Sequence, residues 1–575
     1  MRRARREAYD RCALRREKSP LLPAAIAALI ALLLAGCGSS SHPDGTEADP
    51  ATAVPATAPL YLGATVRPTG GEETGALAAG RALTGTENPY QRLLGALRTP
   101  GSPQLGYAHD VAPWLGPHAG LFALTLGSAS SVLKPLGDSL TGSGPIAPLP
   151  FSAHGLDGAL VMDTRDTSAA RSFLATQAKR AGAHASSYRG VSYEVSPGGV
   201  AFGLVGRFAV IGTEDGLRAV IGTTQGEQAL SAATGYSKLA GSAPSGAIAH
   251  LYVSPGAARS GSASSQGLLE ALGGARQTFA SLTAASGSLR LDIDTLPGAT
   301  GARSGLLSAD PQAAQAFSEL PGESWLGIGI GHAGTSIAGT ATALSALASL
   351  AGAEEAGGAL SLGSLIGGLT GPLKILGAET AAARRDYRSW MGPAGIFAAG
   401  SGVLELKAAV SISSTDAARS RAAVGKLGAA LRRAGDEVTP VRVPGTETAL
   451  SIQLPGVPLA LYVAAGQSQS GPKFVLALGE AAIAAALAPS STLAEAPARA
   501  AAASALGAGT QPSAIADFPT LLALLEGVGL GEDPSLSPLL PYLRASGTLA
   551  GGGRQLEGGV ERFSLVLRLR SAGEA

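Results

Sequence analysis

The sequence is poor in cysteine, aromatic residues and charge. Its two cysteines, Cys12 and Cys37, are too few for the disulfide framework that stabilises many small exported domains. Aromatic residues make up only 4% of the chain and charged residues 15%. The fold must therefore be stabilised by burial of small aliphatic side chains. We expect a globular protein with alanine-rich and leucine-rich cores.

Turn-forming residues, in contrast, are abundant. The chain has 80 glycines and 36 prolines among 575 residues, which favours many short elements over long helical rods. Single domains seldom grow beyond about 250 residues, so a chain of this length is expected to contain at least two.

The first 36 residues have the layout of a signal peptide. Residues 1–20 carry eight Lys or Arg and three Asp or Glu, and an uncharged apolar run from Leu21 to Leu34 follows. This run of about 14 residues is shorter than the roughly 20 that a membrane-spanning helix needs. Because export would remove the basic cluster, we expect no nucleic acid among the partners of the folded body.

Residues 34–37, Leu-Ala-Gly-Cys, resemble a bacterial lipobox, in which a peptidase cleaves before a cysteine that carries diacylglycerol. Two acyl chains anchor a protein stably, whereas one chain gives only marginal attachment. We therefore predict lipidation of Cys37 and localisation at the outer, extracytoplasmic face of the cell membrane. An ordinary signal peptide with an unmodified cysteine is the alternative. Residues 37–57, rich in Ser, Thr, Pro and Ala, are interpreted as a flexible tether.

A block of residues recurs in the two halves of the chain. Residues 110–122 read DVAPWLGPHAGLF and residues 386–397 read DYRSWMGPAGIF, so Trp114 and Trp390 occupy the same place in the block. Tryptophan occurs only three times in the chain, which makes this match informative.

Further matches follow in the same order. They are DTSAAR from residue 166 with STDAAR from 414, FAVIG from 208 with FVLAL from 474, AIAHL from 247 with AIADF from 514, and LRLDID from 289 with LVLRLR from 565. We therefore predict two tandem copies of one domain, at residues 58–296 and 320–571, with a connection at residues 297–319.

Each copy is expected to combine antiparallel strands with helices. Apolar runs separated by Pro-Gly-Gly and Gly-Arg turns indicate an antiparallel meander over residues 191–212. A helix is predicted from about residue 167 to 181, with Asp166 or Thr167 as its N-cap, and its counterpart in the second copy should end at Gly435. The predicted fold class is α+β, with a mainly antiparallel sheet covered by helices in each tandem copy.

The recurring PWLGP pattern at residues 113–117, the order of strand, helix and meander, and the lipobox together resemble the bacterial domain of unknown function family 3352. The resemblance extends over essentially the whole mature chain. It implies an exported protein of this architecture. That family has no established activity, so the resemblance implies no catalytic residues.

Two short motifs have precedents in cofactor binding or catalysis. Gly329, Gly331 and Gly334 fit G-x-G-x-x-G, but no acidic residue follows at the end of a second strand, and a glycine-rich turn is favoured. Ser131 and Lys134 fit the S-x-x-K pair of penicillin-binding enzymes, but the K-T-G and S-D-N companions are missing, and an insertion loop is favoured. We predict no cofactor, and an enzyme is the less favoured class.

The histidines and the repeated tryptophans are the remaining candidates. The seven histidines show no H-E-x-x-H pattern and no carboxylates at ligand spacing, so no metal site is predicted. Trp114 and Trp390 could line a ligand pocket, but a core position at a turn explains their recurrence beside Gly-Pro more simply.

These observations favour a non-catalytic, lipid-anchored envelope protein that binds an envelope partner or a hydrophobic ligand. The alternatives are a lipid carrier, an exported serine hydrolase, and a solute-binding receptor with two parallel-sheet lobes around a cleft. An uncharged run from Trp325 to Ala353 raises the question of a second membrane segment. Its Gly, Ser and Thr content favours a strand followed by a weakly apolar helix.

Overall fold

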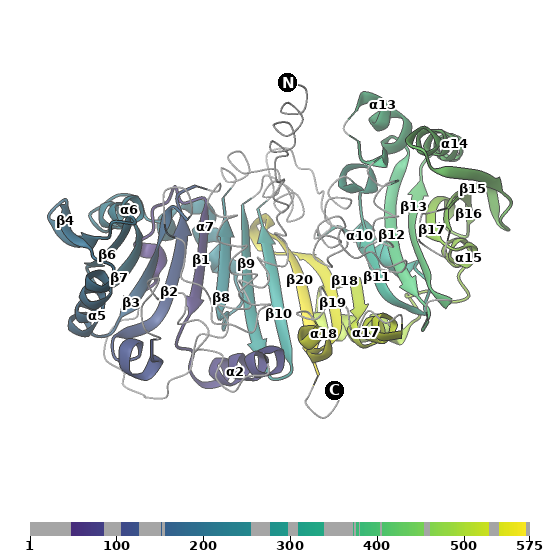
Figure 1. Cartoon of the computed structure of the whole chain (residues 1–575). Helices are drawn as coiled ribbons and strands as arrows, with labels where there is room; N and C mark the ends of the chain where they lie inside the picture. Colours follow the sequence, from purple (N-terminus) through teal and green to yellow (C-terminus); the bar gives the residue numbers. More distant parts are fainter. Residues whose placement is uncertain are drawn as a thin grey trace, which may run out of the picture.

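The computed structural model describes residues 48–84, 105–125, 151, 156–254, 277–296, 309–337, 372, 375–378, 380–402, 405–453, 460–527 and 540–570. Within these residues the protein is α+β, and 20 strands form one continuous sheet (Figure 1). Every pairing between these strands is antiparallel. The expectation of a mainly antiparallel α+β fold is therefore confirmed.

The strands of the first half lie in the order β4-β5-β6-β7-β3-β2-β1-β8-β9-β10. The first strand, β1, is thus inserted between β2 and β8. The bounds are β1 (Leu60–Thr65), β2 (Leu115–Ala123), β3 (Gly158–Thr164), β4 (His184–Tyr188), β5 (Val191–Val195), β6 (Val200–Val205), β7 (Phe208–Thr213), β8 (Ala249–Val253), β9 (Thr278–Ala285) and β10 (Ser288–Thr295).

The strands of the second half lie in the order β14-β15-β16-β17-β13-β12-β11-β18-β19-β20. Here β11 is inserted between β12 and β18, as β1 is in the first half. The bounds are β11 (Ser324–Ile330), β12 (Met391–Ala399), β13 (Lys407–Ser414), β14 (Glu437–Val441), β15 (Thr446–Gln453), β16 (Leu461–Ser468), β17 (Gly471–Leu478), β18 (Gln511–Asp517), β19 (Ser546–Gln555) and β20 (Glu561–Leu569).

The two halves are joined edge to edge by β10 and β20, which lie side by side near the centre of Figure 1. These strands run antiparallel, with Ser288 opposite Arg568 and Thr295 opposite Glu561. Because β9 and β19 pair with their other sides, neither strand is an edge of the sheet. The last strand of each half therefore has its main-chain groups paired on both sides.

Short helices connect the strands and cover the sheet. In the first half they are η1 (Pro50–Thr52), α2 (Gly70–Thr84), η3 (Tyr107–Val111), α5 (Thr167–Arg180), α6 (Glu214–Thr224), η4 (Leu230–Ala232) and α7 (Thr234–Ser242). In the second half they are α10 (Pro311–Ser318), α13 (Ala381–Ala383), η5 (Arg384–Arg388), α14 (Ala417–Ala434), α15 (Glu480–Leu487), α16 (Pro497–Leu506), α17 (Phe518–Gly527), α18 (Leu540–Ala545) and η8 (Glu557–Gly559).

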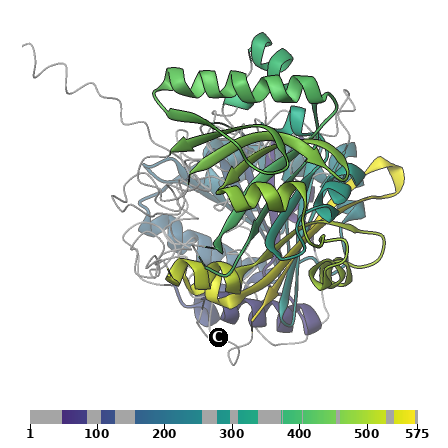
Figure 2. The same ribbon diagram turned by 90° about the vertical axis from the view of Figure 1, so that its right-hand side faces the viewer.

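Each half has one hydrophobic cluster on each face of its sheet. In β1, Leu62 belongs to the cluster under α5, whereas the adjacent Tyr61 belongs to the cluster under α6 and α7. Neighbouring residues of a strand point to opposite faces, so these two clusters lie on opposite sides. In the second half, α14 covers one face and α10, α15 and α16 cover the other. The long helix α14 lies along the strands near the top of Figure 2.

The predicted helix after the third strand and the predicted meander are confirmed. Asp166 caps α5 by accepting hydrogen bonds from the amides of Ser168 and Ala169, both at 2.9 Å. The counterpart α14 ends at Gly435, whose φ of 100° is readily adopted by glycine. The meander consists of β5, β6 and β7.

The tether predicted at residues 37–57 overlaps the folded domain, which begins by residue 48. Ala48 onward is described, and Ala51, Val54 and Ala58 are fully buried in the cluster under α6 and α7. The segment begins with Asp49, which caps η1, followed by Pro50, and this Asp-Pro pair starts a helical turn. This packing was hidden because buried alanines in a Pro-rich stretch show no hydrophobic periodicity.

A second helix that begins with an Asp-Pro pair lies inside the predicted connection at residues 297–319. Asp310 caps α10, Pro311 follows it, and Ala313 and Phe317 pack against the second half of the sheet. Residues 309–319 therefore belong to the second half rather than to the connection.

Within the described part of the chain, no helix is both long enough and apolar enough to cross a membrane. The uncharged run that begins at Trp325 opens within β11, the strand that its composition favoured.

Candidate binding site at the junction of the two halves

The repeated tryptophans are buried, one in each half. Trp114 is 1% exposed and Trp390 is 0% exposed. The indole N–H of Trp114 donates to the carbonyl of Asp110 at 2.7 Å, and that of Trp390 donates to the carbonyl of Asp386 at 3.0 Å. Both indoles therefore have a buried hydrogen-bond partner four residues earlier, and both serve the core.

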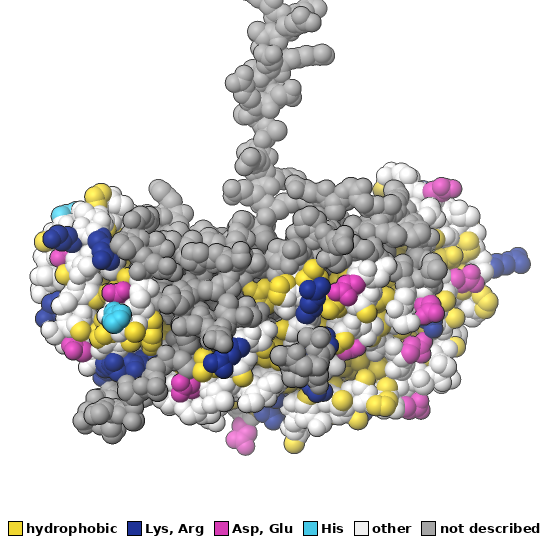
Figure 3. Space-filling model, turned by 60° about the horizontal axis from the view of Figure 1, so that its bottom comes forward, with side chains coloured by type: hydrophobic (Ala, Val, Ile, Leu, Met, Phe, Trp, Pro, Cys, Tyr) yellow, Lys and Arg dark blue, Asp and Glu magenta, His cyan; other side chains and the backbone are white. Residues whose placement is uncertain are grey.

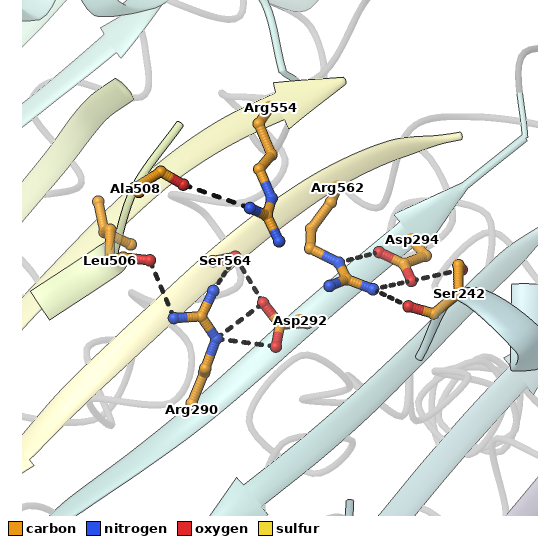
Figure 4. A network of polar contacts seen from close by, with 9 residues as sticks. All are labelled: Ser242, Arg290, Asp292, Asp294, Leu506, Ala508, Arg554, Arg562 and Ser564. Carbon is orange, nitrogen blue, oxygen red and sulfur yellow. Dashed lines mark hydrogen bonds and ion pairs between the residues drawn. The ribbon is translucent and has the colours of Figure 1, made fainter. Parts of the chain in front are cut away.

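A network of buried charges lies instead where β10 meets β20 (Figure 4). Asp294 on β10 lies directly opposite Arg562 on β20. The Nε and Nη2 atoms of Arg562 donate to the two carboxylate oxygens of Asp294, both at 2.7 Å. Nη2 also donates to the carbonyl of Ser242, the last residue of α7. An arginine of the second half thus binds the open carbonyl end of a first-half helix.

A second arginine makes the reciprocal contact. Arg290 on β10 donates from Nη1 to the carbonyl of Leu506, the last residue of α16, at 3.0 Å. Its Nε lies 2.9 Å from Oδ2 of Asp292 on the same strand, and its Nη2 donates to Oγ of Ser564 on β20 at 2.9 Å. Each half therefore supplies an arginine to the C-terminus of a helix in the other half.

The pair formed by Arg562 and Asp294 is almost completely withdrawn from water. The side chain of Asp294 is 0% exposed and that of Arg562 is 6% exposed. Burial by itself would lower the pKa of Arg562, but the hydrogen bonds and charge of Asp294 raise it above the usual value. Arg562 is therefore held in its charged form, and each member of the pair depends on the other for compensation.

A cavity of about 440 Å³ opens beside this network. It lies between α7 and the hairpin that connects β19 to β20, and Lys238, Arg554, Glu557 and Arg562 contribute charged groups to its wall. Lys238 and Glu557 are exposed, whereas Arg562 is buried. The cavity has the volume of an ordinary small-ligand site, which lies between about 300 and 1,000 Å³.

Figure 3 shows one face of the molecule, on which basic and acidic side chains of the described residues are interspersed with hydrophobic and neutral ones. The charged residues that line the cavity are Lys238, Arg554, Glu557 and Arg562.

Comparison with known proteins assigns the chain to a family. A family model described as "Protein of unknown function (DUF3352)" matches residues 21–352, more than half of the chain. The chain belongs to the DUF3352 family. The matched residues include β1 to β11 and end before β12. No curated protein matches the sequence.

Two crystal forms of TP0453 are among the similar solved structures. They are 11% and 12% identical to this DUF3352 protein. The similar part covers 44% of its chain and 80% and 81% of the two TP0453 chains. The TM-score is 0.24 in both comparisons. A likeness at this level carries no argument about the fold or function of the DUF3352 protein.

The glycine motif of this DUF3352 protein serves helix packing. A Cβ on Gly329 would lie 1.8 Å from the carbonyl oxygen of Ala313, and one on Gly331 would lie 1.9 Å from Oδ2 of Asp310. Both glycines therefore allow α10, the helix before the motif, to pack closely on β11. The strand pairs antiparallel with β12 and β18, unlike the parallel strand of a dinucleotide fold.

Several candidates from the sequence lie outside the described residues. These are Cys37, Ser131, Lys134, His42 and His154. Among the described histidines, His118 and His250 lie on β2 and β8 of the first half. No group of three or more His, Cys, Asp or Glu side chains in the described part of the chain is arranged to hold a metal ion.

The junction residues were missed by the sequence interpretation. Arg562 and Asp294 are 268 positions apart, so no local pattern connects them. One signal was available in the matched run LRLDID, where Arg290, Asp292 and Asp294 alternate with apolar residues. When one face of a strand carries three charges and the other is apolar, the charges are either paired with partners or exposed to solvent. In this DUF3352 protein they are paired across the junction.

Proposed function

We propose that the protein is a non-catalytic binding protein, anchored by lipid on Cys37 at the extracytoplasmic face of the cell membrane. The observation that carries the anchor is the Leu-Ala-Gly-Cys sequence at residues 34–37 after a basic segment and an apolar run. The described body begins at residue 48, so about ten residues separate Cys37 from the first packed turn. The folded body would therefore lie close to the membrane surface.

The binding role is supported by the cavity at the junction. It combines a ligand-sized volume with convergent polar groups and is lined from both halves, by Lys238 and Ser242 from the first and by Arg554, Glu557 and Arg562 from the second. A solute receptor with two hinged lobes would separate its halves by a cleft, whereas here β10 and β20 join them in one sheet.

A carrier of a hydrophobic ligand is less well supported. A wholly apolar hollow lies on the second half between Ile330, Ile337, Ile396 and Ile412. Its volume of about 10 Å³ is close to the space that one water occupies. A lipid chain does not fit into a hollow of this size.

We also propose that the two halves are tandem copies of one domain. Support comes from the identical order of strand pairings, with β1 and β11 each inserted between a following strand and a much later one. The π-helical turns η3 and η5 precede Trp114 and Trp390 in the same way. The two Asp-Pro starts, at Asp49 and Asp310, add a match that the repeated strings did not include.

The anchor is tested by the mass and location of the mature protein. In a bacterium that processes lipoproteins, the wild-type chain should lose residues 1–36, gain the mass of its acyl groups and fractionate with the membrane. Cys37→Ser should abolish the added mass and membrane attachment. Cys12→Ser is the matched control and should change neither property, because Cys12 lies in the removed segment. A Cys37→Ser protein that keeps the wild-type mass modification and location would contradict the proposal.

The duplication is tested with the two tryptophans as equivalent probes. Trp114→Phe and Trp390→Phe should lower the free energy of unfolding by similar amounts, about 1–3 kcal/mol each, because both remove an indole from the same core position. Both variants should also lose a similar share of blue-shifted fluorescence. A large loss of stability in one variant and none in the other would argue against equivalent positions.

A further inference from the structure

The cavity at the junction brings two arginines side by side. Arg554 on β19 and Arg562 on β20 are direct cross-strand partners. Figure 4 shows the two side chains extending side by side, with the Arg554 guanidinium bonded to the carbonyl of Ala508 and that of Arg562 to Asp294. Like charges at directly opposite positions of an antiparallel pair are destabilising, so this arrangement calls for compensation.

The compensation provided by the protein is incomplete. Asp294 and Ser242 engage Nε and Nη2 of Arg562. Arg554 donates from Nη1 to the carbonyl of Ala508 at 3.3 Å, while its buried Nε has no hydrogen-bond partner among the described residues. A buried N–H without an acceptor is rare in folded proteins, so the chain satisfies the guanidinium of Arg554 incompletely.

A third cation faces the same space. Lys238 reaches the cavity from α7, and its Cε lies 3.5 Å from the position that a Cβ on Gly558 would occupy. The opposing carboxylates are Asp294, which is engaged with Arg562, and Glu557, which is exposed at the rim. The groups around the cavity therefore leave an excess of one positive charge, in a site whose base is buried and whose rim is open to water.

We propose that this cavity binds an oxyanion of the phosphate class, held by Arg554, Arg562 and Lys238. Guanidinium groups match the oxygen geometry of phosphate and bind it through charge-assisted hydrogen bonds, and an ammonium adds a point charge. An anion between Arg554 and Arg562 would offset the repulsion between these cross-strand partners on β19 and β20, next to the junction. The inference deepens the proposed binding role and does not depend on lipid at Cys37.

The phosphate has two sources, a free phosphate compound or the headgroup of an anionic phospholipid. Both present the same phosphate oxygens to the cavity. The experiment therefore has one arm for each source, and both use the full chain with Cys37→Ser so that a lipid anchor cannot contribute to membrane binding.

The first arm measures binding of inorganic phosphate and of glycerol phosphate by titration calorimetry at low salt. Lys238→Gln and Arg554→Gln should each weaken binding about tenfold, because each removes a charge-assisted hydrogen bond. Glu557→Gln should strengthen binding, because it removes the carboxylate at the rim. Lys179→Gln, an exposed position on α5, is the matched control and should bind like the wild type.

The second arm measures flotation with vesicles of phosphatidylglycerol and phosphatidylcholine, compared with vesicles of phosphatidylcholine alone. Binding only to the anionic vesicles, lost in Lys238→Gln, supports a headgroup ligand. Phosphate binding without vesicle binding supports a free ligand. Lys238 and Glu557 are exposed, so their variants should fold even if Arg554→Gln does not. The proposal is overturned if neither ligand binds, or if the Lys238 and Glu557 variants bind like the Lys179 control.

Discussion

The two halves place paired glycines at corresponding positions in the sheet but fill the space above them differently. Gly63 pairs with Gly120 between β1 and β2, and Gly329 pairs with Gly395 between β11 and β12. In the second half α10 packs directly on this site, since a Cβ on Gly329 would meet the main chain of Ala313. The glycines thus provide the clearance that a close helix needs.

Aromatic rings occupy the corresponding space in the first half. A Cβ on Gly63 would lie 2.4 Å from the imidazole of His250, and one on Gly120 would lie 2.5 Å from the ring of Tyr61. The helix is absent there because Pro55 follows the single turn of η1, whereas α10 continues from its Asp-Pro start for eight residues. The same clearance in the sheet is therefore filled either by a helix or by side chains.

The two tryptophans also pack against rings that come from different elements in the two halves. Trp114 packs against Phe173 from α5, with the ring centroids 4.9 Å apart. Trp390 packs against Phe474 from β17, with the ring centroids 5.2 Å apart. The indole keeps its place and its hydrogen bond in both halves, while a different element supplies the partner ring. The two sites therefore fill a similar space beside the indole with rings from different elements.

The largest expected effect concerns the junction that both halves share. Asp294→Ala leaves Arg562 buried without its carboxylate, so the free energy of unfolding should fall by about 3–5 kcal/mol. Glu323→Gln is the matched control, because its pair with Lys407 is exposed at 41% and 36%. That change should cost less than about 1 kcal/mol. Urea unfolding of the two variants checks this, and equal losses would show that the junction pair is not special.

The next effect is a pH dependence of stability that arises in the first half, at His250 on β8. Burial lowers the pKa of His250 to about 4. Tyr61, Tyr236 and Phe279 surround its ring, His118 opposes its protonation and Asp49 favours it. Because its pKa in the folded chain lies below the unfolded value near 6.5, the folded state binds fewer protons and stability falls as the pH drops from about 6.5 to 4.

The size of this loss is on the order of 3 kcal/mol for the whole shift. Urea unfolding at pH 7.5 and pH 4.5 measures most of it. His250→Gln should reduce the difference between the two pH values, because the glutamine does not titrate. A variant with an unchanged pH dependence would show that other groups are responsible.

A smaller effect compares the glycines. Gly329→Ala should lower the free energy of unfolding by about 2–3 kcal/mol, because the obstacle is the main chain of α10. Gly63→Ala should lower it less, by about 1–2 kcal/mol, because the obstacle there is the side chain of His250 rather than a main chain. Thermal unfolding monitored by circular dichroism checks the order. A larger loss at Gly63 would contradict the view that a helix tolerates less intrusion than a side chain.

The smallest expected effect is a gain. Gly425 lies on the exposed side of α14, and a Cβ there would meet nothing within 4 Å. Gly425→Ala should raise the free energy of unfolding by about 0.5–1 kcal/mol, because alanine is the better helix former. Chemical denaturation of this variant provides the positive control for the two glycine losses. A decrease in stability would mean that α14 is covered at this point.

Local patterns in the sequence predicted much of the fold. The N-cap at Asp166, the glycine that ends α14 and the meander of β5 to β7 each depend on residues within a few positions, and each was found. The helical starts at Asp49 and Asp310 were missed because periodicity was given more weight than the Asp-Pro pair. Giving the capping residues equal weight would have located both helix starts.

The junction could not be predicted in the same way. Its contacts join residues 216 to 320 positions apart, and they form only when β10 pairs with β20. Charges such as Arg290 and Asp294 in an apolar strand signal that partners exist, but they do not identify them. The repeated blocks indicated similar halves, yet similarity does not determine which strands meet.

Covalent trapping of the junction tests the account most directly. Leu291 on β10 lies opposite Leu565 on β20, and both are half-buried. In a chain with Cys12→Ser and Cys37→Ser, Leu291→Cys combined with Leu565→Cys should form an intramolecular disulfide on mild oxidation, since directly opposite residues lie about 4.5–5.5 Å apart. Leu291→Cys with Arg568→Cys, three residues out of register, should remain reduced. Failure of the first pair to crosslink, or equal crosslinking of both, would contradict the joining of the halves through these strands.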